Sequence, residues 1–154
     1  MESGIDTERA KVLLHIAVGS PLRAIQLQDS AASDLYAMLP QDLHAIVEGE
    51  TRPAEISGRW GEADIRVTIA WLQWQMFAAI RAGLGGNVIQ AASRLFSYLG
   101  RKRCFALYED LGIFLQWPAK AIDEILFLES VVMRLFEPQV ELKAGGLRSR
   151  SLLR

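Results

Sequence analysis

The segment between Glu62 and Ala82 constrains the fold of this chain more than any other, because two apolar stripes at helical spacing run side by side along it. One stripe comprises Ile65, Ile69, Leu72, Met76 and Ala79, and the other comprises Val67, Trp71, Trp74 and Ala78. A helix that is apolar over most of its circumference must be surrounded by other helices. The pattern therefore predicts a central helix on which only Arg66, Gln73 and Arg81 are solvated. Its apolar run is shorter than the roughly 20 residues that a membrane span requires.

Helical periodicity continues along most of the chain, and we find no pair of strands joined by a hairpin turn. The first helix is predicted to begin with a cap at Asp6-Thr7 and to end at a left-handed Gly19. A second begins at the cap Ser20 with Pro21 in its first turn. Further helices are expected over residues 31–39, 41–48, 53–60, 88–99, 101–116 and 121–136, with Pro40 interrupting the first two of these. We predict an all-α protein with a bundle of about five main helices.

The apolar stripes predict which residues face the core. The inward sets are Leu22, Ile25 and Leu27 on the second helix; Ile89, Ala92, Leu95, Phe96 and Leu99 on the helix over 88–99; Cys104, Phe105, Leu107, Tyr108, Leu111, Phe114 and Leu115 on the helix over 101–116; and Ile122, Ile125, Leu126, Val132, Met133 and Phe136 on the last. Apolar residues left over are candidate contacts with a partner protein. They are Phe127, Val131 and Leu135 on the last helix and Trp71 and Trp74 on the central one, although core positions suit the tryptophans equally well.

Composition places the chain among ordinary folded domains. A chain of 154 residues can build one core without disulfide bonds or metal ions. With 51% apolar and 23% charged residues, its composition differs clearly from that of disordered proteins. The single cysteine, Cys104, cannot form an internal disulfide, which suits a reducing compartment. The first thirty residues include four acids and resemble no secretory or transit segment. We therefore expect a cytoplasmic protein.

Motifs for nucleotide or metal chemistry are not convincing. The glycine cluster Gly83-Leu84-Gly85-Gly86-Asn87 has no P-loop lysine and favours a turn between helices. The histidines His15 and His44 lie far apart in sequence and in no metal-binding array. We predict no metal, no cofactor and no small-molecule substrate.

Residues that suit catalysis by side chains alone have simpler interpretations. Neighbouring acids at Glu109-Asp110 and Asp123-Glu124 point in different directions on a helix, although Asp110 and Asp123 have the spacing to face each other across a hairpin. Cys104 follows three basic residues, which favours a reactive thiolate, but it falls on an apolar stripe where a core cysteine is the simpler interpretation. We predict that the chain is not an enzyme.

The cluster Arg101-Lys102-Arg103 is unusual because three cations at the start of a helix oppose its dipole. It is either a solvated face compensated by a neighbouring acid or a contact for a phosphate backbone or an acidic partner. Residues 1–142 hold 13 basic and 18 acidic residues, a net charge of −5, and the remaining basic residues lie in the last twelve positions. An acidic body argues against a dedicated duplex-binding surface.

The segment Gly19-Ser20-Pro21-Leu22-Arg23-Ala24-Ile25-Gln26-Leu27 resembles the end of the lid subdomain in the delta-prime subunit of the bacterial DNA polymerase III clamp loader. The order of elements after it is also similar: a long helix at 65–80, a shorter one at 91–99 and a hairpin of two helices at 101–116 and 121–136. The segment 121–129, AIDEILFLE, resembles the last helix of that family. The resemblance covers residues 7–138, with the family's usual asparagine near the last helix replaced by the region Trp117-Pro118-Ala119-Lys120.

The resemblance implies a fragment or truncated relative without the ATPase-like module. Residues 1–30 would be the end of the AAA+ lid, residues 31–138 the collar domain and residues 139–154 a flexible tail. Such a domain joins delta-prime to the gamma/tau ATPase subunits and to delta, and meets DNA only through the assembly. In ATP-hydrolysing relatives the turn reads Gly-Ser-x-Arg-x-Ala, whereas Leu22 occupies the arginine's place here. Arg23 is turned by about 100° from it, so no nucleotide contact is expected.

An alternative function is compatible with the same residues. The chain would then be a stand-alone helical domain that binds a protein or small ligand, with an apolar pocket between Trp71, Trp74 and the last hairpin.

Overall fold

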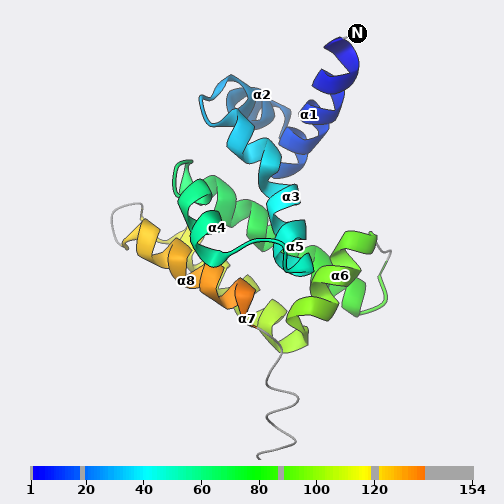
Figure 1. The fold of residues 1–154 in the computed structure, drawn as a ribbon, viewed down its shortest axis with the longest axis vertical. Coiled ribbons are helices and arrows are strands. Elements are labelled where there is room, and N and C mark those ends of the chain that lie inside the picture. Colours follow the sequence, from blue (N-terminus) through cyan, green and yellow to red (C-terminus); the bar gives the residue numbers. More distant parts are fainter. Residues whose placement is uncertain (1, 18–19, 87–88, 119–121, 138–154) are drawn as a thin grey trace, which may run out of the picture.

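The computed structural model describes residues 2–17, 20–86, 89–118 and 122–137. Within these residues every regular element is a helix (Figure 1). The helices are α1 (Glu2–Ile16), α2 (Pro21–Asp29), α3 (Ser33–Glu48), α4 (Pro53–Trp60), α5 (Ile65–Gly83), α6 (Gln90–Leu99), α7 (Arg101–Gln116) and α8 (Glu124–Phe136). The predicted all-α fold is confirmed. No helix in these ranges has both the length and the apolar character that a membrane crossing requires.

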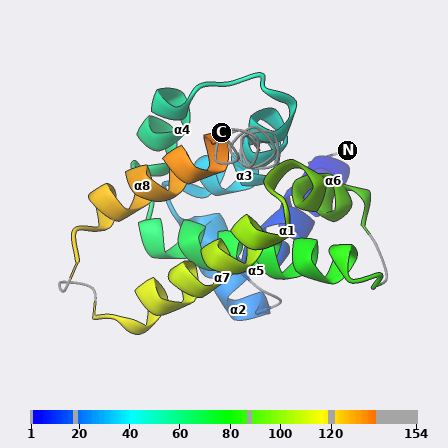
Figure 2. The same ribbon diagram turned by 90° about the horizontal axis from the view of Figure 1, so that it is seen from below.

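Helix α5 is the centre of the bundle, as its two stripes predict. It begins at the cap Asp64, whose carboxylate accepts a hydrogen bond from the backbone N–H of Arg66 at 3.0 Å. Helices α1, α6, α7 and α8 all contact it, and α7 lies alongside it (Figure 2). Ile69, Leu72 and Met76 are fully buried there. The core that forms around α5 is one contiguous cluster that also includes Leu13 of α1.

Helices α1 and α2 lie at one end of the molecule (Figure 1). Helix α1 begins at Glu2, before the predicted cap at Asp6-Thr7, and Gly19 lies outside the described residues. The cap of α2 is confirmed, because the Ser20 hydroxyl accepts a hydrogen bond from the backbone N–H of Arg23 at 3.4 Å. The prediction that Leu22 and Ile25 are buried is wrong, since α1 and α3 cover only the side of this short helix that carries Leu27.

Helix α3 runs without a break through Pro40, contrary to the prediction of two shorter helices. An internal proline costs roughly 3 kcal/mol because it lacks the N–H and crowds the preceding turn. The buried side chains of Tyr36, Leu39, Leu43 and Ile46 lie on both sides of Pro40 and offset that cost. The helix ends at Gly49, whose φ of 73° is left-handed.

Helix α8 buries a different face from the predicted one. Leu128, Val131 and Leu135 are in the core, together with the correctly predicted Val132. The predicted inward residues Ile125, Leu126 and Met133 are exposed. Helix α8 is apolar around most of its circumference, so its buried face depends on the positions of α4, α5 and α7 rather than on its own pattern. Ile89 and Phe105 were also predicted to be buried and are exposed.

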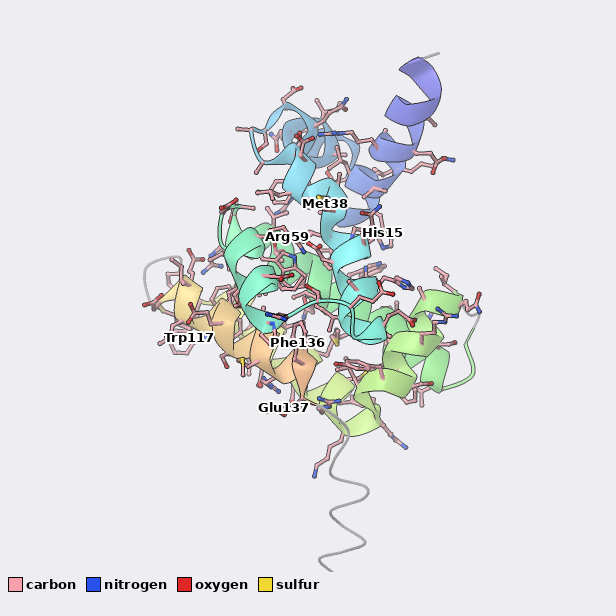
Figure 3. All side chains as sticks on the ribbon, viewed as in Figure 1. His15, Met38, Arg59, Trp117, Phe136 and Glu137 are labelled. Atoms are coloured by element: carbon pink, nitrogen blue, oxygen red, sulfur yellow. The ribbon has the colours of Figure 1, made fainter. Side chains whose placement is uncertain are left out.

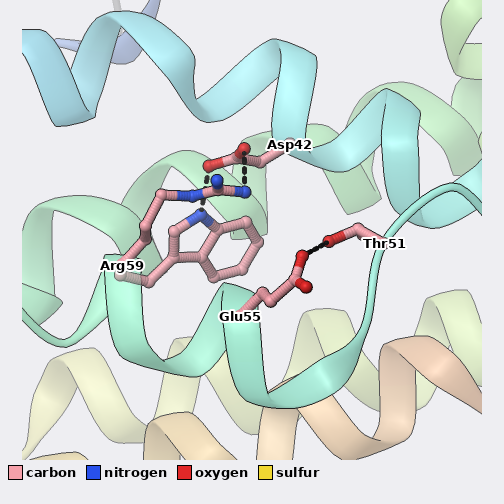
Figure 4. A network of polar contacts seen from close by, with 5 residues as sticks. Asp42, Thr51, Glu55 and Arg59 are labelled. Carbon is pink, nitrogen blue, oxygen red and sulfur yellow. Dashed lines mark hydrogen bonds and ion pairs between the residues drawn. The ribbon is translucent and has the colours of Figure 1, made fainter.

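Helix α4 connects to α3 through a buried polar network (Figure 4). The carboxylate of Asp42, only 4% exposed, accepts hydrogen bonds from Arg59 Nη2 at 2.8 Å and from Trp60 Nε1 at 2.9 Å. Ile56 and Trp60 are both buried, which confirms the short helix opened by Pro53. The network thereby fixes the orientation of α4, which in turn packs on α8.

Arg66 is not solvated, contrary to the prediction; it binds the connected end of the hairpin, where α7 ends and α8 begins. Its Nη2 donates to the carbonyl of Trp117 at 2.6 Å, and its Nε lies 3.1 Å from a carboxylate oxygen of Glu124. The guanidinium also stacks 5.0 Å from the centroid of the Phe114 ring. One side chain from α5 thus contacts the last turn of α7 and the first turn of α8.

The contacts of Arg103 explain how this cation is accommodated at the start of α7. Its Nε donates to the carbonyl of Leu99 at 2.9 Å and its Nη2 to that of Tyr98 at 3.3 Å. Its Nη1 donates to the carbonyls of Arg134, at 3.1 Å, and Glu137. The guanidinium therefore lies where α6 and α8 both end and where a cation is favoured by their dipoles. In Figure 3, Glu137 lies just after the end of α8 and Trp117 just after the end of α7.

Candidate functional site

An aromatic groove lies between α5 and α7 on the described surface. It is lined by Ala70, Gln73, Trp74 and Phe77 from α5 and by Tyr108 from α7, and its volume is about 290 Å³. The four α5 residues follow helical spacing, which places them on one face. That face borders α7 and is separate from the faces of α5 that fill the core.

The rings in this aromatic groove form a chain of contacts. The centroids of Trp74 and Phe77 are 5.4 Å apart and those of Phe77 and Tyr108 are 6.3 Å apart, with tilted ring planes. These distances lie in the favourable range for aromatic pairs. The Trp74 side chain is nevertheless 41% exposed. Aromatic surface that is ordered by its neighbours and open to water is typical of binding sites.

One arginine, Arg81, lies against a ring of the groove, and a second, Arg101, lies nearer the start of α7. The guanidinium of Arg81 lies 5.9 Å from the centroid of Phe77, and that of Arg101 lies 5.9 Å from the centroid of Phe105, one turn before Tyr108 on α7. Cations held over aromatic faces remain available for a second partner at an exposed site. The edge of the groove is therefore suited to carboxylates on a binding partner.

Of the five apolar residues predicted as partner contacts, Trp74 alone is exposed. Trp71 is 1% exposed, and Val131 and Leu135 are equally deep in the core. Phe127 is partly buried, with its ring stacked 4.2 Å from that of Phe114. Trp71, Val131 and Leu135 are therefore corrected to internal packing: Trp71 takes the core position that was the alternative, and the packing of α8 turns Val131 and Leu135 inward.

The basic cluster divides into two parts. Arg101 and Lys102 are exposed, whereas Arg103 is engaged with the ends of α6 and α8. The positive charge of Arg103 is therefore compensated by backbone carbonyls rather than by an acidic neighbour. For Arg101 and Lys102 both predictions stand, a solvated face and a contact with an acidic or phosphate-bearing partner.

The sequence reasoning missed Phe77 and placed Tyr108 among the inward residues. The signal for Phe77 was its spacing of three and four residues from Trp74 and Arg81, which indicates a shared face. Nothing local indicates that α7 would bring Tyr108 to the same place, because that approach depends on helix packing.

Residues considered for acid–base or metal chemistry have structural partners. The carboxylate of Asp110 pairs with Arg134 at 2.7 Å, and that of Asp123 accepts from the backbone N–H of Leu126 at 3.1 Å. Asp123 thus caps α8 instead of facing Asp110. His15 and His44, distant in sequence, line one cavity. In the described ranges no three His, Cys, Asp or Glu residues gather as a metal site would require.

The thiol of Cys104 is fully buried, which confirms the core interpretation. Burial raises its pKa from 9.0 to about 11, and the charge of Arg103 opposes that rise only in part. A raised pKa disfavours the thiolate, which is the reactive form.

We expect Cys104 to resist alkylation in the folded protein. At mildly alkaline pH a rise of the pKa from 9.0 to about 11 lowers the thiolate fraction about a hundredfold, before burial is counted. The measurement is the rate of labelling by iodoacetamide in native buffer against that in denaturant. Equal rates would contradict the buried site. Because unfolding lowers this pKa, the stability that the buried thiol contributes is complete below pH 9 and is lost as the pH rises towards 11.

Comparison of this chain with protein-family models, curated proteins and solved structures gives no match.

Proposed function

We propose that this chain is a non-catalytic assembly domain that binds partner proteins through the aromatic groove, and that these partners are the gamma/tau ATPase and delta subunits of a bacterial clamp loader. The observation that carries the proposal is the exposure of Trp74 on an ordered aromatic face of the central helix. Through such an assembly, the domain would support loading of the sliding clamp on primed DNA.

The chemistry of the groove favours a protein partner. Tryptophan, tyrosine and arginine are the residue types that most often dominate binding energy at protein interfaces. Trp74, Tyr108 and Arg81 bring all three types to one surface. Both helices that carry them are anchored in the core, so little conformational entropy is lost on binding. The expected partner surface is an apolar helix face bordered by Asp or Glu.

The identity of the partners rests on the sequence resemblance. Its support comes from the lid-like segment with the Ser20-Pro21 cap and from the order of one long helix, one shorter helix and a final hairpin. The division into a lid remnant, a collar domain and a tail, the delta-prime identity and the cytoplasmic location belong to the same proposal.

The test is co-elution of the chain with purified gamma/tau and delta subunits in size-exclusion chromatography. We expect the unaltered chain to co-elute and Trp74→Ala to weaken binding about thirtyfold, as loss of a central aromatic contact does. The matched control is Trp117→Ala, because Trp117 is similarly exposed, at 46%, but lies in the connection after α7 (Figure 3).

Failure of the folded, unaltered chain to co-elute would refute the clamp-loader partners. Co-elution with equal loss in both tryptophan variants, or with no loss in Trp74→Ala, would refute the aromatic groove as the contact surface.

A second candidate function is a stand-alone domain that binds a small ligand. The observation that favours it is a cavity beside Trp71. The cavity differs in place from the predicted pocket, because it lies among α1, α3, α5 and α6, and neither Trp74 nor the last hairpin lines it. Such a function predicts a ligand-dependent rise in melting temperature in the absence of any partner.

A further inference from the structure

Gln73 brings a side-chain amide into the lining of the aromatic groove. The side chain is partly buried, and it makes no hydrogen bond with the part of the chain that the structure describes. A side-chain amide carries two N–H donors and a carbonyl acceptor. Once a partner covers the groove, water no longer reaches these groups, so each one that the partner leaves unpaired costs binding free energy.

Gly112 of α7 makes room for this amide. Glycine is unfavourable in the interior of a helix, yet α7 continues through Gly112 without a break. A Cβ atom at position 112 would lie 2.7 Å from Nε2 of Gln73, which is closer than non-bonded atoms approach. That nitrogen is the free end of a flexible side chain, so an added methyl group would displace the amide and leave α7 in place. The missing side chain at position 112 therefore determines where the amide lies.

Arg81 supplies a charged group about two helical turns from the amide. Eight residues separate Gln73 from Arg81 on α5, which corresponds to about 12 Å along the helix axis. The Arg81 side chain is exposed, its guanidinium lies over the ring of Phe77, and it pairs with no carboxylate of the described residues. An amide and a cation at this fixed separation can select the register of a partner helix, which apolar surface alone does not.

We propose that Gln73 is a specificity-determining residue of the aromatic groove, and that it binds the side-chain amide of an Asn or Gln on a partner helix whose Asp or Glu, seven or eight positions away, binds Arg81. Two facing amides can each donate and accept one hydrogen bond, which satisfies both. A helix with an apolar residue at that position leaves the Gln73 amide unpaired and is disfavoured. The inference rests on the proposed function and adds the partner's recognition pattern to it.

The test is isothermal titration calorimetry of the full chain and its variants with the purified gamma/tau and delta subunits. Gln73→Leu, which keeps the approximate size of the side chain, should weaken binding about tenfold. Gln73→Glu and Gln73→Lys should each weaken binding by at least as much, because neither can both donate and accept as an amide does. The matched control is Gln41→Leu, which alters an exposed glutamine of α3 and should change nothing.

A second variant tests the position of the amide without any partner. Gly112→Ala should shift the side-chain ¹⁵N resonances of Gln73 in the free protein, where they are assigned by their absence in Gln73→Leu. The same variant should weaken partner binding about tenfold. Its melting temperature should not fall, because alanine favours a helix more than glycine does. The side-chain resonances of Gln41 should stay unchanged.

The outcomes separate this inference from the proposed function. No binding by the unaltered chain would refute the clamp-loader partners and this recognition with them. Binding that Trp74→Ala weakens and Gln73→Leu leaves unchanged would refute the role of Gln73 alone. Tighter binding by Gln73→Glu or Gln73→Lys would show that the partner group is charged, and unshifted Gln73 resonances in Gly112→Ala would show that Gly112 does not position the amide; either result would overturn the inference.

Discussion

Replacing Asp42 by alanine is expected to lower the free energy of unfolding by about 3 kcal/mol, because it removes at once the acceptor of the buried Trp60 indole and of the partly exposed Arg59 guanidinium. Arg59 and Trp60 would both lose their partner, and the buried indole N–H of Trp60 gains no access to bulk water without a movement of α4. Asp42→Asn should cost about half as much, since one amide oxygen can serve only one of the two donors in the same geometry. Urea denaturation followed by circular dichroism measures both.

The control for this prediction is Asp34→Ala. Asp34 also binds an arginine, Arg9, at 2.6 Å, but its side chain is 83% exposed. A surface ion pair of this kind is worth at most about 1 kcal/mol. If Asp42→Ala were no more destabilising than Asp34→Ala, the polar network in Figure 4 would not be what holds α4 against α3.

Replacing Arg103 by alanine is expected to cost about 3 kcal/mol of stability, because charge-assisted hydrogen bonds to the last carbonyls of two helices are lost together. Arg103→Lys should recover little of this, since one ammonium group cannot reach the ends of both α6 and α8 as the planar guanidinium does. Hydrogen exchange should also accelerate at the C-terminal turns of both helices. Thermal unfolding and exchange measured by NMR test the two effects.

The control for this second prediction lies in the same basic cluster. Arg101 is exposed, and its guanidinium lies over the ring of Phe105, so Arg101→Ala should change stability by at most about 1 kcal/mol. Equal destabilisation by the Arg101 and Arg103 variants would show that net charge at the start of α7, rather than the capping of α6 and α8, is the important quantity.

Signals that act within one turn of helix were predictable from the sequence. Ser20 and Pro21 open α2 as predicted, and the predicted limits at residues 48, 53 and 99 coincide with Gly49, Pro53 and Gly100. Each of these residues acts on the backbone beside it, through a fixed φ, a left-handed φ or a side-chain acceptor. Their effect does not depend on the position of distant segments.

The candidate sites were only partly predictable. Trp74 was one of the candidate partner contacts, but Tyr108, which lines the same groove, comes from a helix whose approach no local pattern encodes. Val131 was predicted to contact a partner because it lay outside the predicted core stripe, but it is buried in the core. On a helix that is apolar nearly all round, periodicity gives several equivalent faces, and only the neighbouring helices select among them.

The sequence by itself determined that the chain is helical, where most helices begin and end, and that the helix around Trp71 is central, because periodicity, capping and proline geometry are local or statistical properties of the chain. The tertiary structure alone decided which face of α8 is buried, that Arg66 and Arg103 bind helix ends instead of solvent, and that His15 and His44 share a cavity. These outcomes depend on contacts between residues far apart in sequence, whose energies are set only when the helices have packed.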